Sequence, residues 1–448
     1  MNKYALFNEA IDRRSTGSDK WDKYSNKGII PMWVADMDFR APPEVLQAIT
    51  DRNYHGIYGY QSKPLDLLTL IQARYRERYD WHFELDSLSL VSGVVPAMNQ
   101  VCRALLAEGE AAITVTPVYY PFLAMGTNSD RTLIQVPAEP ISDGAHGAPG
   151  ANGANGANGA NGANGANGAK DNQPPYDARQ QAGSEHLHSE HVANLPSGTS
   201  GGAVDPTYAE NHYPYPIDAL RQALERNPQA RLLLLCNPWN PVGRVLSRAE
   251  LDAIAALAHE FDLIICSDEI HFELLFDHHS HLCIANLNDD TRQRTITVSA
   301  ATKTFNIAGL GGAWVIIENH DLRRKFERFG RGLNQGNNPL TVAATQAALA
   351  ECEYWRLGLL EHLRSNRALL RSTIEQTEGI SMNEIQGTYL AWLNIQKLNL
   401  SDPAPFFESH GLGLSLGAQF AGPGYMRLNM GCTQATMREA CKRLSTIR

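Results

Sequence analysis

The chain has 448 residues and a formal net charge of −9 at pH 7, with acidic side chains outnumbering basic ones. This length exceeds one average domain and allows a large apolar core, so we expect two domains. The acidic balance excludes the basic surface by which proteins bind nucleic acids or anionic membranes, and it favours a small soluble partner.

The ends of the chain and its cysteines indicate where the protein is found. Residues Met1–Asp12 carry acidic side chains and no apolar run, so we expect no secretory signal. No stretch reaches the roughly 18 apolar residues that a membrane-spanning helix needs. The seven cysteines are scattered and lack C-x-x-C spacing, which predicts reduced, mostly buried thiols. We therefore expect a cytoplasmic protein.

Short apolar runs alternate with helical patterns over the first three quarters of the chain. Residues 88–91 precede a turn and a helix that begins near Pro96. Further strands are expected at residues 112–115, 231–235, 263–266, 295–299 and 314–317. This alternation is typical of a parallel sheet with crossover helices, so the fold class is predicted to be α/β.

Residues 143–205 interrupt this pattern. Glycine falls at every third position from Gly144 to Gly168, mostly in Gly-Ala-Asn triplets, and a polar stretch follows. A collagen-like triple helix is disfavoured because almost no proline occupies the other positions. We expect a disordered low-complexity insertion.

Two groups of histidines could suggest a metal site. One lies inside the insertion and the other lies further along the chain: His186, His188 and His191, then His278, His279 and His281. Neither group is completed by cysteines or carboxylates, so we expect solvated loops and no metal.

The pattern changes to long helical periodicity from about Asn338, and strands are expected at residues 389–395 and 425–430. This tail predicts a second, smaller α+β domain. We expect an N-terminal segment, residues 1–50, that joins the small domain. The large domain then covers residues 51–352, insertion included, and the small domain covers residues 353–448.

Polar motifs follow three of the predicted strands. Asn237–Gly243 contains two Asn-Pro pairs, Ser267–His271 contains two acids, and a third motif, residues 299–306, contains Lys303. Because the carboxyl ends of parallel strands share one edge of a sheet, we expect Asn240, Asp268 and Lys303 to lie close together.

This combination of side chains points to a cofactor. Pyridoxal phosphate requires a lysine for its aldehyde, an acid for its pyridine nitrogen and an amide for its phenolic oxygen. At a buried sheet edge, desolvation and a neighbouring cation can lower the pKa of Lys303 enough for nucleophilic work.

Five segments carry a more specific resemblance: Met32–Phe39, His55–Tyr60, Ser267–His271, Lys303–Ile307 and Thr388–Leu393. On these residues the chain resembles the fold type I pyridoxal-phosphate enzymes of the aminotransferase class I/II superfamily. Within it, the chain is most similar to the MalY/PatB branch of cystathionine β-lyases, also called C-S lyases. The similarity covers nearly the whole chain apart from the insertion, and it implies a mostly parallel seven-stranded sheet in the large domain.

The resemblance implies a role for each residue of the cofactor ring site. Lys303 would form the Schiff base with the cofactor and, once substrate displaces it, remove the Cα proton. Asp268 would pair with the protonated pyridine nitrogen, which keeps the ring an electron sink. Asn240 would donate to the phenolic oxygen, and Tyr119 would stack on the ring.

The resemblance also implies a phosphate cradle shared between two subunits. The backbone N–H groups of Val94 and Val95, at the start of a helix, would bind the phosphate. The hydroxyls of Ser299 and Thr302 would complete the cradle, and Tyr60 would reach it from a partner subunit. A homodimer is therefore part of the expected active site.

The substrate would lie beside this cofactor. Arg427 matches the family arginine that grips an α-carboxylate with two parallel hydrogen bonds, and Ala35 and Asp36 would border the pocket. The chain departs from the superfamily pattern at Val242, where threonine is common, and at residues 309–313, which lack a frequent arginine. The phosphate would therefore receive less cationic help.

The branch resemblance favours β-elimination from L-cystathionine or a cysteine S-conjugate, giving a thiol, pyruvate and ammonia. Transamination shares every cofactor contact, so residue chemistry leaves both reactions open. A regulatory interaction protein that retains the fold is a second alternative, which the intact set of Lys303, Asp268, Asn240 and Arg427 disfavours. The sequence does not identify the leaving thiolate or the pathway.

Overall fold

The structure is a computed structural model, and it describes residues 5–141, 213–333 and 338–447. The low-complexity insertion predicted at residues 143–205 lies outside these ranges. The described helices are α1 (Asp19–Asp22), α2 (Pro43–His55), α3 (Leu65–Tyr79), α4 (Val94–Leu105), α5 (Tyr120–Leu123), α6 (Met125–Ser129), α7 (Ile217–Arg226), α8 (Arg248–Glu260), α9 (Asp289–Arg294), α10 (His320–Gly330), α11 (Pro339–Glu351), α12 (Glu353–Ile374), α13 (Pro403–Ser409) and α14 (Gln434–Leu444).

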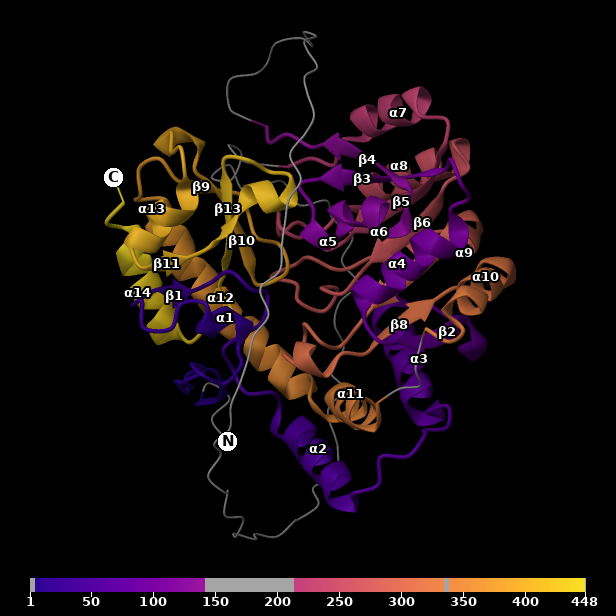
Figure 1. The fold of residues 1–448 in the computed structure, drawn as a ribbon, viewed down its shortest axis with the longest axis horizontal. Helices are drawn as coiled ribbons and strands as arrows, with labels where there is room; N and C mark the ends of the chain where they lie inside the picture. The colour runs from indigo at the N-terminus through magenta and orange to yellow at the C-terminus, as the bar shows by residue number, and fades with distance from the viewer. Residues whose placement is uncertain (1–4, 142–212, 334–337, 448) are drawn as a thin grey trace. The chain divides into compact units, whose positions relative to one another are not determined.

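A seven-stranded sheet forms the centre of the structure, in the order β2-β8-β7-β6-β5-β3-β4 (Figure 1). Its strands are β2 (Leu88–Val91), β3 (Ala111–Thr116), β4 (Thr132–Pro137), β5 (Ala230–Cys236), β6 (Ile264–Asp268), β7 (Thr295–Ser299) and β8 (Ala313–Ile316). Strand β8 runs antiparallel to both of its neighbours, and the pairs from β7 to β4 are parallel. The predicted α/β fold with a mostly parallel seven-stranded sheet is confirmed.

Apolar helices cover both faces of this sheet, as parallel strands require. Successive residues of β5 point to opposite faces, so Leu233 and Leu235 join one core cluster while Leu232 and Leu234 join another. The first cluster includes the apolar sides of α7 and α8. The second includes α4 and α10, which lie next to each other (Figure 1).

Helix α8 shows how local sequence fixes these elements. Ser247 accepts a hydrogen bond from the backbone of Glu250, whose carboxylate accepts one from the Ser247 backbone. This capping box satisfies donors that the first helical turn leaves without partners. Arg244 pairs with the same carboxylate at 2.8 Å, which ties the motif after β5 to the helix.

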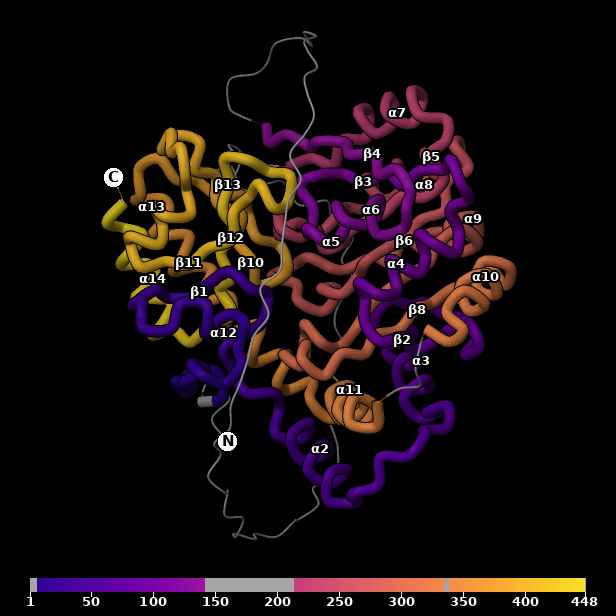
Figure 2. The backbone as a smooth tube through the Cα atoms, in the orientation of Figure 1, coloured from indigo at the N-terminus to yellow at the C-terminus, as the bar shows by residue number. Residues whose placement is uncertain are grey.

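A second sheet is built from the C-terminal residues, in the order β12-β13-β10-β9. Its strands are β9 (Ser381–Met382), β10 (Leu390–Asn394), β12 (Ser415–Leu416) and β13 (Tyr425–Asn429), and all its pairs are antiparallel. The N-terminal strand β1 (Ile30–Pro31) pairs with β11 (Leu412–Gly413). Figure 2 accordingly shows the indigo N-terminal residues beside the yellow C-terminal ones.

The predicted strands lie within a residue or two of their positions in the structure, whereas β4 and the short strands β1, β9, β11 and β12 were not predicted individually. The seven cysteines are buried and unpaired, as expected. In the part of the chain that the structure describes, no helix is long and apolar enough to cross a membrane. By their contacts the described residues form one unit, so the domain boundaries at residues 50 and 352 stay predictions.

Candidate active site

The carboxyl edge of the central sheet brings the predicted motifs together. Asp268 ends β6 and pairs in register with Cys236 of β5 and Val298 of β7. Asn240 lies four residues beyond the end of β5, and Lys303 lies four residues beyond the end of β7. Since these strands are parallel, all three side chains are delivered to the same edge.

Lys303 is held by the N-terminal part of the chain. Its Nζ donates a hydrogen bond to the Ala35 carbonyl oxygen at 2.7 Å. Burial of the amine, together with the nearby charge of Arg427, lowers the Lys303 pKa to about 8, although Asp36 and Asp268 act in the opposite direction. A substantial neutral fraction is therefore available near physiological pH, as a nucleophile or base requires.

Asp268 is a buried carboxylate whose oxygens could accept further hydrogen bonds. Its side chain is 3% exposed, and within the described residues its one hydrogen bond comes from the Ile270 backbone N–H at 3.1 Å. Burial raises the Asp268 pKa to about 7, while Ile270 and Lys303 oppose the shift. Because an isolated buried anion is costly, a cation placed against Asp268 would be bound strongly.

Arg427 connects the second sheet to the motif that follows β5. It lies on β13, where its Nη1 donates to Asn240 Oδ1 at 3.2 Å and its Nη2 donates to the Trp33 carbonyl at 2.8 Å. Its guanidinium lies 4.4 Å from the centroid of the Phe420 ring. Burial lowers the Arg427 pKa to about 10, so the side chain stays charged at neutral pH.

The predicted phosphate cradle falls at the start of α4 and the end of β7. Val94 and Val95 open α4, and the first N–H groups of a helix have no partner within it. Ser299 is buried, and its Oγ donates to the Glu269 carbonyl at 3.2 Å. Thr302 is 8% exposed and lies next to Lys303.

A cavity of about 520 Å³ lies beside Lys303 and Arg427. Its lining residues are Asp19, Trp33, Val34, Ala35, Tyr119, Tyr120, Lys303, Ser415, Gln419 and Arg427. Tyr119 immediately precedes α5, and its ring packs against Tyr120 with centroids 4.9 Å apart. The predicted lysine, stacking tyrosine, substrate arginine and Ala35 therefore share one cavity.

Eight of the predicted residues are not part of this cavity lining: Val94, Val95, Asn240, Asp268, Ser299, Thr302, Asp36 and Tyr60. Asp36 binds Arg13 through both of its carboxylate oxygens, at 3.2 and 2.7 Å. Tyr60 is fully exposed. Its contact with a partner's phosphate stays a prediction, since the structure contains one chain.

Sequence reasoning did not single out several residues of the site. His271 belongs to a motif used for the resemblance, yet its buried Nδ1 has no partner among the described residues. Burial, and then Lys303 and Arg427, lower its pKa to about 3, so the imidazole is neutral. Tyr120, Ser415 and Gln419 come from separate segments without a local pattern, and the fold alone brings them together.

The expectation of a solvated loop is wrong for His281 of the second histidine group, because His281 is buried in a cluster of potential metal ligands that includes a carboxylate and a cysteine. Among the described residues, Glu269, His281 and Cys283 place ligand atoms within 4.8 Å of one another. His281 Nε2 lies 2.8 Å from Glu269 Oε2, and Ser267 Oγ donates to Glu269 Oε1 at 3.0 Å. These hydrogen bonds already satisfy the carboxylate, so the cluster needs no ion to be stable.

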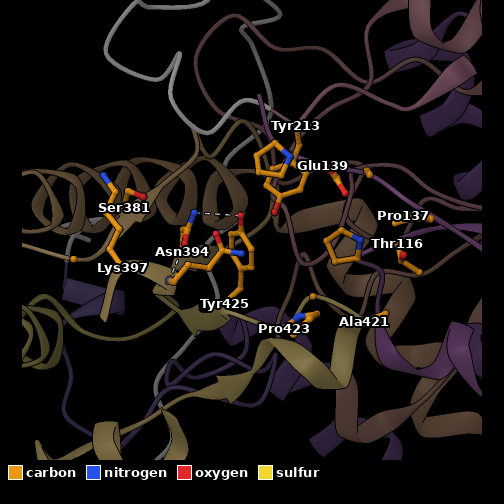
Figure 3. A pocket seen from close by; sticks show the side chains of 16 residues that line it. Thr116, Pro137, Glu139, Tyr213, Ser381, Asn394, Lys397, Ala421, Pro423 and Tyr425 are labelled. Atoms are coloured by element: carbon orange, nitrogen blue, oxygen red, sulfur yellow. Dashed lines mark hydrogen bonds between the residues drawn. The ribbon is translucent and has the colours of Figure 1, made fainter. Parts of the chain in front are cut away.

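A larger cavity, of about 690 Å³, lies elsewhere, and Figure 3 shows its lining. Tyr213 and Tyr425 line it together with Asn394, which donates to the Tyr425 hydroxyl at 3.2 Å. None of the predicted site residues lines this cavity. Its volume alone therefore does not make it the catalytic centre.

Comparison with known proteins assigns the chain to a family. The model of the aminotransferase class I and II family matches residues 200–444. The chain belongs to this family. A similar relative in this family is "Cystathionine beta-lyase PatB" of Bacillus subtilis (strain 168), 28% identical over 455 residues, which cover 98% of each chain.

Solved structures agree with this assignment. The crystal structure of OvoB is 29% identical, and that of cystalysin from Treponema denticola is 25% identical. Each has a TM-score of 0.79, and each match covers 98% of both chains. The cystalysin structure contains a pyridoxal 5′-phosphate cofactor. The aminotransferase class I and II fold therefore extends well beyond the segment matched by the family model.

Proposed function

We propose that the chain is a pyridoxal-phosphate-dependent carbon-sulfur lyase that cleaves L-cystathionine or a cysteine S-conjugate. The observation that carries this proposal is the contact of Arg427 with Asn240 beside Lys303. It joins the arginine expected to bind a substrate carboxylate, which lines the cavity together with Lys303, to the amide expected to bind the cofactor. The similarity to PatB favours the lyase reaction.

The residues at the sheet edge fit pyridoxal phosphate. Asp268 is a buried carboxyl group whose side chain accepts a single hydrogen bond from the described residues, and a protonated pyridine nitrogen would supply a cation that favours its charged form. The amine of Lys303, with its lowered pKa, suits an aldehyde. The unpartnered Nδ1 of buried His271 leaves a further polar position for a ligand.

The chain offers suitable groups for each part of the cofactor. Val94 and Val95 would bind the phosphate through their backbone N–H groups, since helix N-termini attract anions. The hydroxyls of Ser299 and Thr302 would add to this cradle. Tyr119 would cover the ring, and Asn240 would donate its amide N–H to the phenolic oxygen, because Asn240 Oδ1 already accepts from Arg427.

The residues of the cavity also account for substrate binding and proton transfer. Arg427 would bind the α-carboxylate through two parallel charge-assisted hydrogen bonds. Lys303 would take the proton from Cα, and a thiolate would leave from Cβ. The bound cofactor supplies an electron sink for the pair left behind at Cα. Trp33 and Tyr120 would exclude water from one wall of the cavity.

Pyruvate release tests this proposal. Purified protein loaded with cofactor is incubated with L-cystathionine, without any keto acid, and pyruvate is followed through NADH oxidation by lactate dehydrogenase. We expect steady pyruvate formation, with none from a Lys303→Ala variant. Turnover that begins only when a keto acid is added would contradict the lyase and indicate a transaminase.

We further propose that the active enzyme is a homodimer. Exposed large apolar side chains gather between α2 and the start of α3: Tyr54, Ile57, Tyr58, Tyr60 and Leu65. Contiguous apolar side chains on a surface mark interaction sites. A second copy covering this segment would bring Tyr60 into the neighbouring cavity. A cytoplasmic location is proposed as well, supported by the seven buried, unpaired cysteines.

A further inference from the structure

The backbone of Trp33–Asp36 accepts hydrogen bonds from several polar side chains in and near the cavity. The Trp33 carbonyl oxygen accepts hydrogen bonds from Arg427 and Ser415, and Asn429 donates to the carbonyl oxygens of Val34 and Asp36. The shorter of these contacts are 2.5 to 2.6 Å. The segment belongs to no helix or strand. Its backbone carbonyls therefore accept hydrogen bonds from side chains of other elements instead of from a neighbouring strand.

The Ala35 carbonyl within this segment accepts two hydrogen bonds. Lys303 Nζ donates to it at 2.7 Å, and the Tyr389 hydroxyl donates at 2.8 Å. A carbonyl oxygen has two lone pairs, so both bonds can form together. Tyr389 therefore contacts the carbonyl that accepts from the Lys303 amine, and among the hydrogen bonds of the described residues none joins Tyr389 directly to Lys303.

Tyr389 is firmly fixed in this position. Its side chain is 1% exposed, and its ring packs edge-on against His271 with centroids 5.9 Å apart. The preceding residue, Thr388, has φ of 69°, which is an uncommon conformation for a β-branched residue. Backbone hydrogen bonds of Thr388 N to Leu274 O and Met430 N to Tyr389 O hold the turn. Strained backbone that is held so closely is frequent at functional sites.

We propose that Tyr389 is a positioning residue for the ε-amine of Lys303. It holds the Ala35 carbonyl in the orientation that receives the amine whenever the amine is not bound covalently. The inference rests on the proposed role of Lys303 as the base, and it adds a residue to that machinery.

The chemistry of an amine explains why this contact matters. A neutral amine that donates one N–H to a fixed carbonyl must direct its lone pair elsewhere, because both cannot point at the same oxygen. The lone pair is the atom's site for accepting the Cα proton, so orienting the carbonyl orients the base. Burial raises the pKa of the Tyr389 hydroxyl, so this hydroxyl stays protonated and keeps donating.

Sharing the carbonyl also tunes the basicity of Lys303. The Tyr389 hydroxyl draws on the same oxygen and weakens its attraction for a lysine ammonium. If the Tyr389 hydroxyl is removed, the Ala35 carbonyl oxygen accepts from Lys303 alone and stabilises the protonated form of the Lys303 amine more strongly. The Lys303 pKa should then rise, and a higher pH should be needed to obtain the neutral base.

The variant Tyr389→Phe tests this proposal in two ways. In the full chain freed of cofactor, competitive acetylation of Lys303 across pH gives its pKa, and we expect a rise of about 0.5 pH unit or more. In the cofactor-loaded protein, exchange of the Cα proton of L-alanine in D₂O should slow about tenfold, with its acidic limb at higher pH. An unchanged Lys303 pKa would overturn the proposal.

The variant Tyr425→Phe is the matched control. Tyr425 is also a buried tyrosine, and its hydroxyl also takes part in a hydrogen bond, with Asn394 at 3.2 Å, but it lines the other cavity. We expect the Lys303 pKa and the exchange rate to match wild type. An equal shift in both variants would show a general effect of losing a buried hydroxyl and would contradict positioning by Tyr389.

Two features of the design keep the result decisive. If Tyr389→Phe does not fold, 3-fluorotyrosine at position 389 keeps the shape and donates more strongly, so the Lys303 pKa should fall; a rise or no change would contradict the proposal. L-alanine carries no leaving group, so its exchange does not depend on the lyase reaction. If the wild-type protein forms no pyruvate but still exchanges the Cα proton of L-alanine, the proposed lyase reaction is rejected and the proposal for Tyr389 is not affected.

Discussion

Lys303 and Asp268 are single residues of opposite charge at the carboxyl edge of the sheet, and burial shifts the pKa of both. Burial lowers the Lys303 pKa to about 8 and raises the Asp268 pKa to about 7. In both side chains the charged form is disfavoured, because the buried surroundings solvate a charge less well than water does. A ligand that brings a cation to Asp268 and an aldehyde to Lys303 would relieve both costs, and this is the physical reason for expecting the cofactor here.

The role of Arg427 gives a prediction at this scale. In Arg427→Lys the charge remains but the two parallel hydrogen bonds to a carboxylate are lost, so we expect KM for L-cystathionine to rise about 10- to 100-fold. Cofactor content should stay unchanged. Steady-state kinetics of pyruvate release provides the measurement.

The control for this change is Arg438→Lys, because Arg438 is exposed on α14 and pairs only with Gln434 among the described residues. Its KM should equal that of wild type. If KM also stays at the wild-type value in Arg427→Lys, another residue binds the substrate carboxylate.

Local sequence marks some of these residues and cannot mark others. Lys303, Asp268 and Asn240 were predicted because each follows an apolar strand within a distinctive motif. The partner of Tyr389 could not be predicted, since Tyr389 and Ala35 are 354 positions apart and a backbone carbonyl leaves no trace in the sequence. The neutral state of His271 likewise depends on burial, which only the fold reveals.

At the scale of elements, apolar runs predicted the inner strands of the sheet well. Strands β5, β6 and β7 are almost entirely buried, so short runs of aliphatic or β-branched residues identify them. Strand β4 lies at the edge of the sheet, has one buried residue in six and ends in Pro137. Edge strands need less apolar sequence and tolerate proline, which explains why β4 was not predicted from its residues.

The N-terminal segment illustrates a second limit of sequence patterns. Trp33–Asp36 has no periodicity, and its conformation comes from side chains that donate to its carbonyls. Its neighbour Asp38 accepts from Lys20 at 2.9 Å and Arg13 at 2.7 Å. These ion pairs anchor the segment against the site, and no local propensity could have indicated them.

At the scale of the whole molecule, the proposed homodimer gives a prediction that depends on shared sites. Lys303→Ala and Tyr60→Ala chains should each have little lyase activity alone. A heterodimer of the two contains one site with an intact Lys303 and an intact partner Tyr60, so coexpression should restore up to about half of the activity per dimer. Pyruvate release by the purified mixed dimer provides the measurement.

The same experiment can reject the shared site. If Tyr60 acts within its own chain, the mixed dimer has one site without Lys303 and one without Tyr60, and activity stays as low as in the parent variants. Size-exclusion chromatography of each variant controls for loss of the dimer itself.

The covalent link between Lys303 and the cofactor is the central claim, and peptide mapping tests it most directly. Borohydride reduces the link in the cofactor-loaded protein, and mass spectrometry of the digested protein then locates the added mass. We expect the reduced cofactor on the peptide that contains Lys303 and no labelling in Lys303→Ala. Cofactor found on another lysine, or a reducible link that persists in Lys303→Ala, would contradict the account.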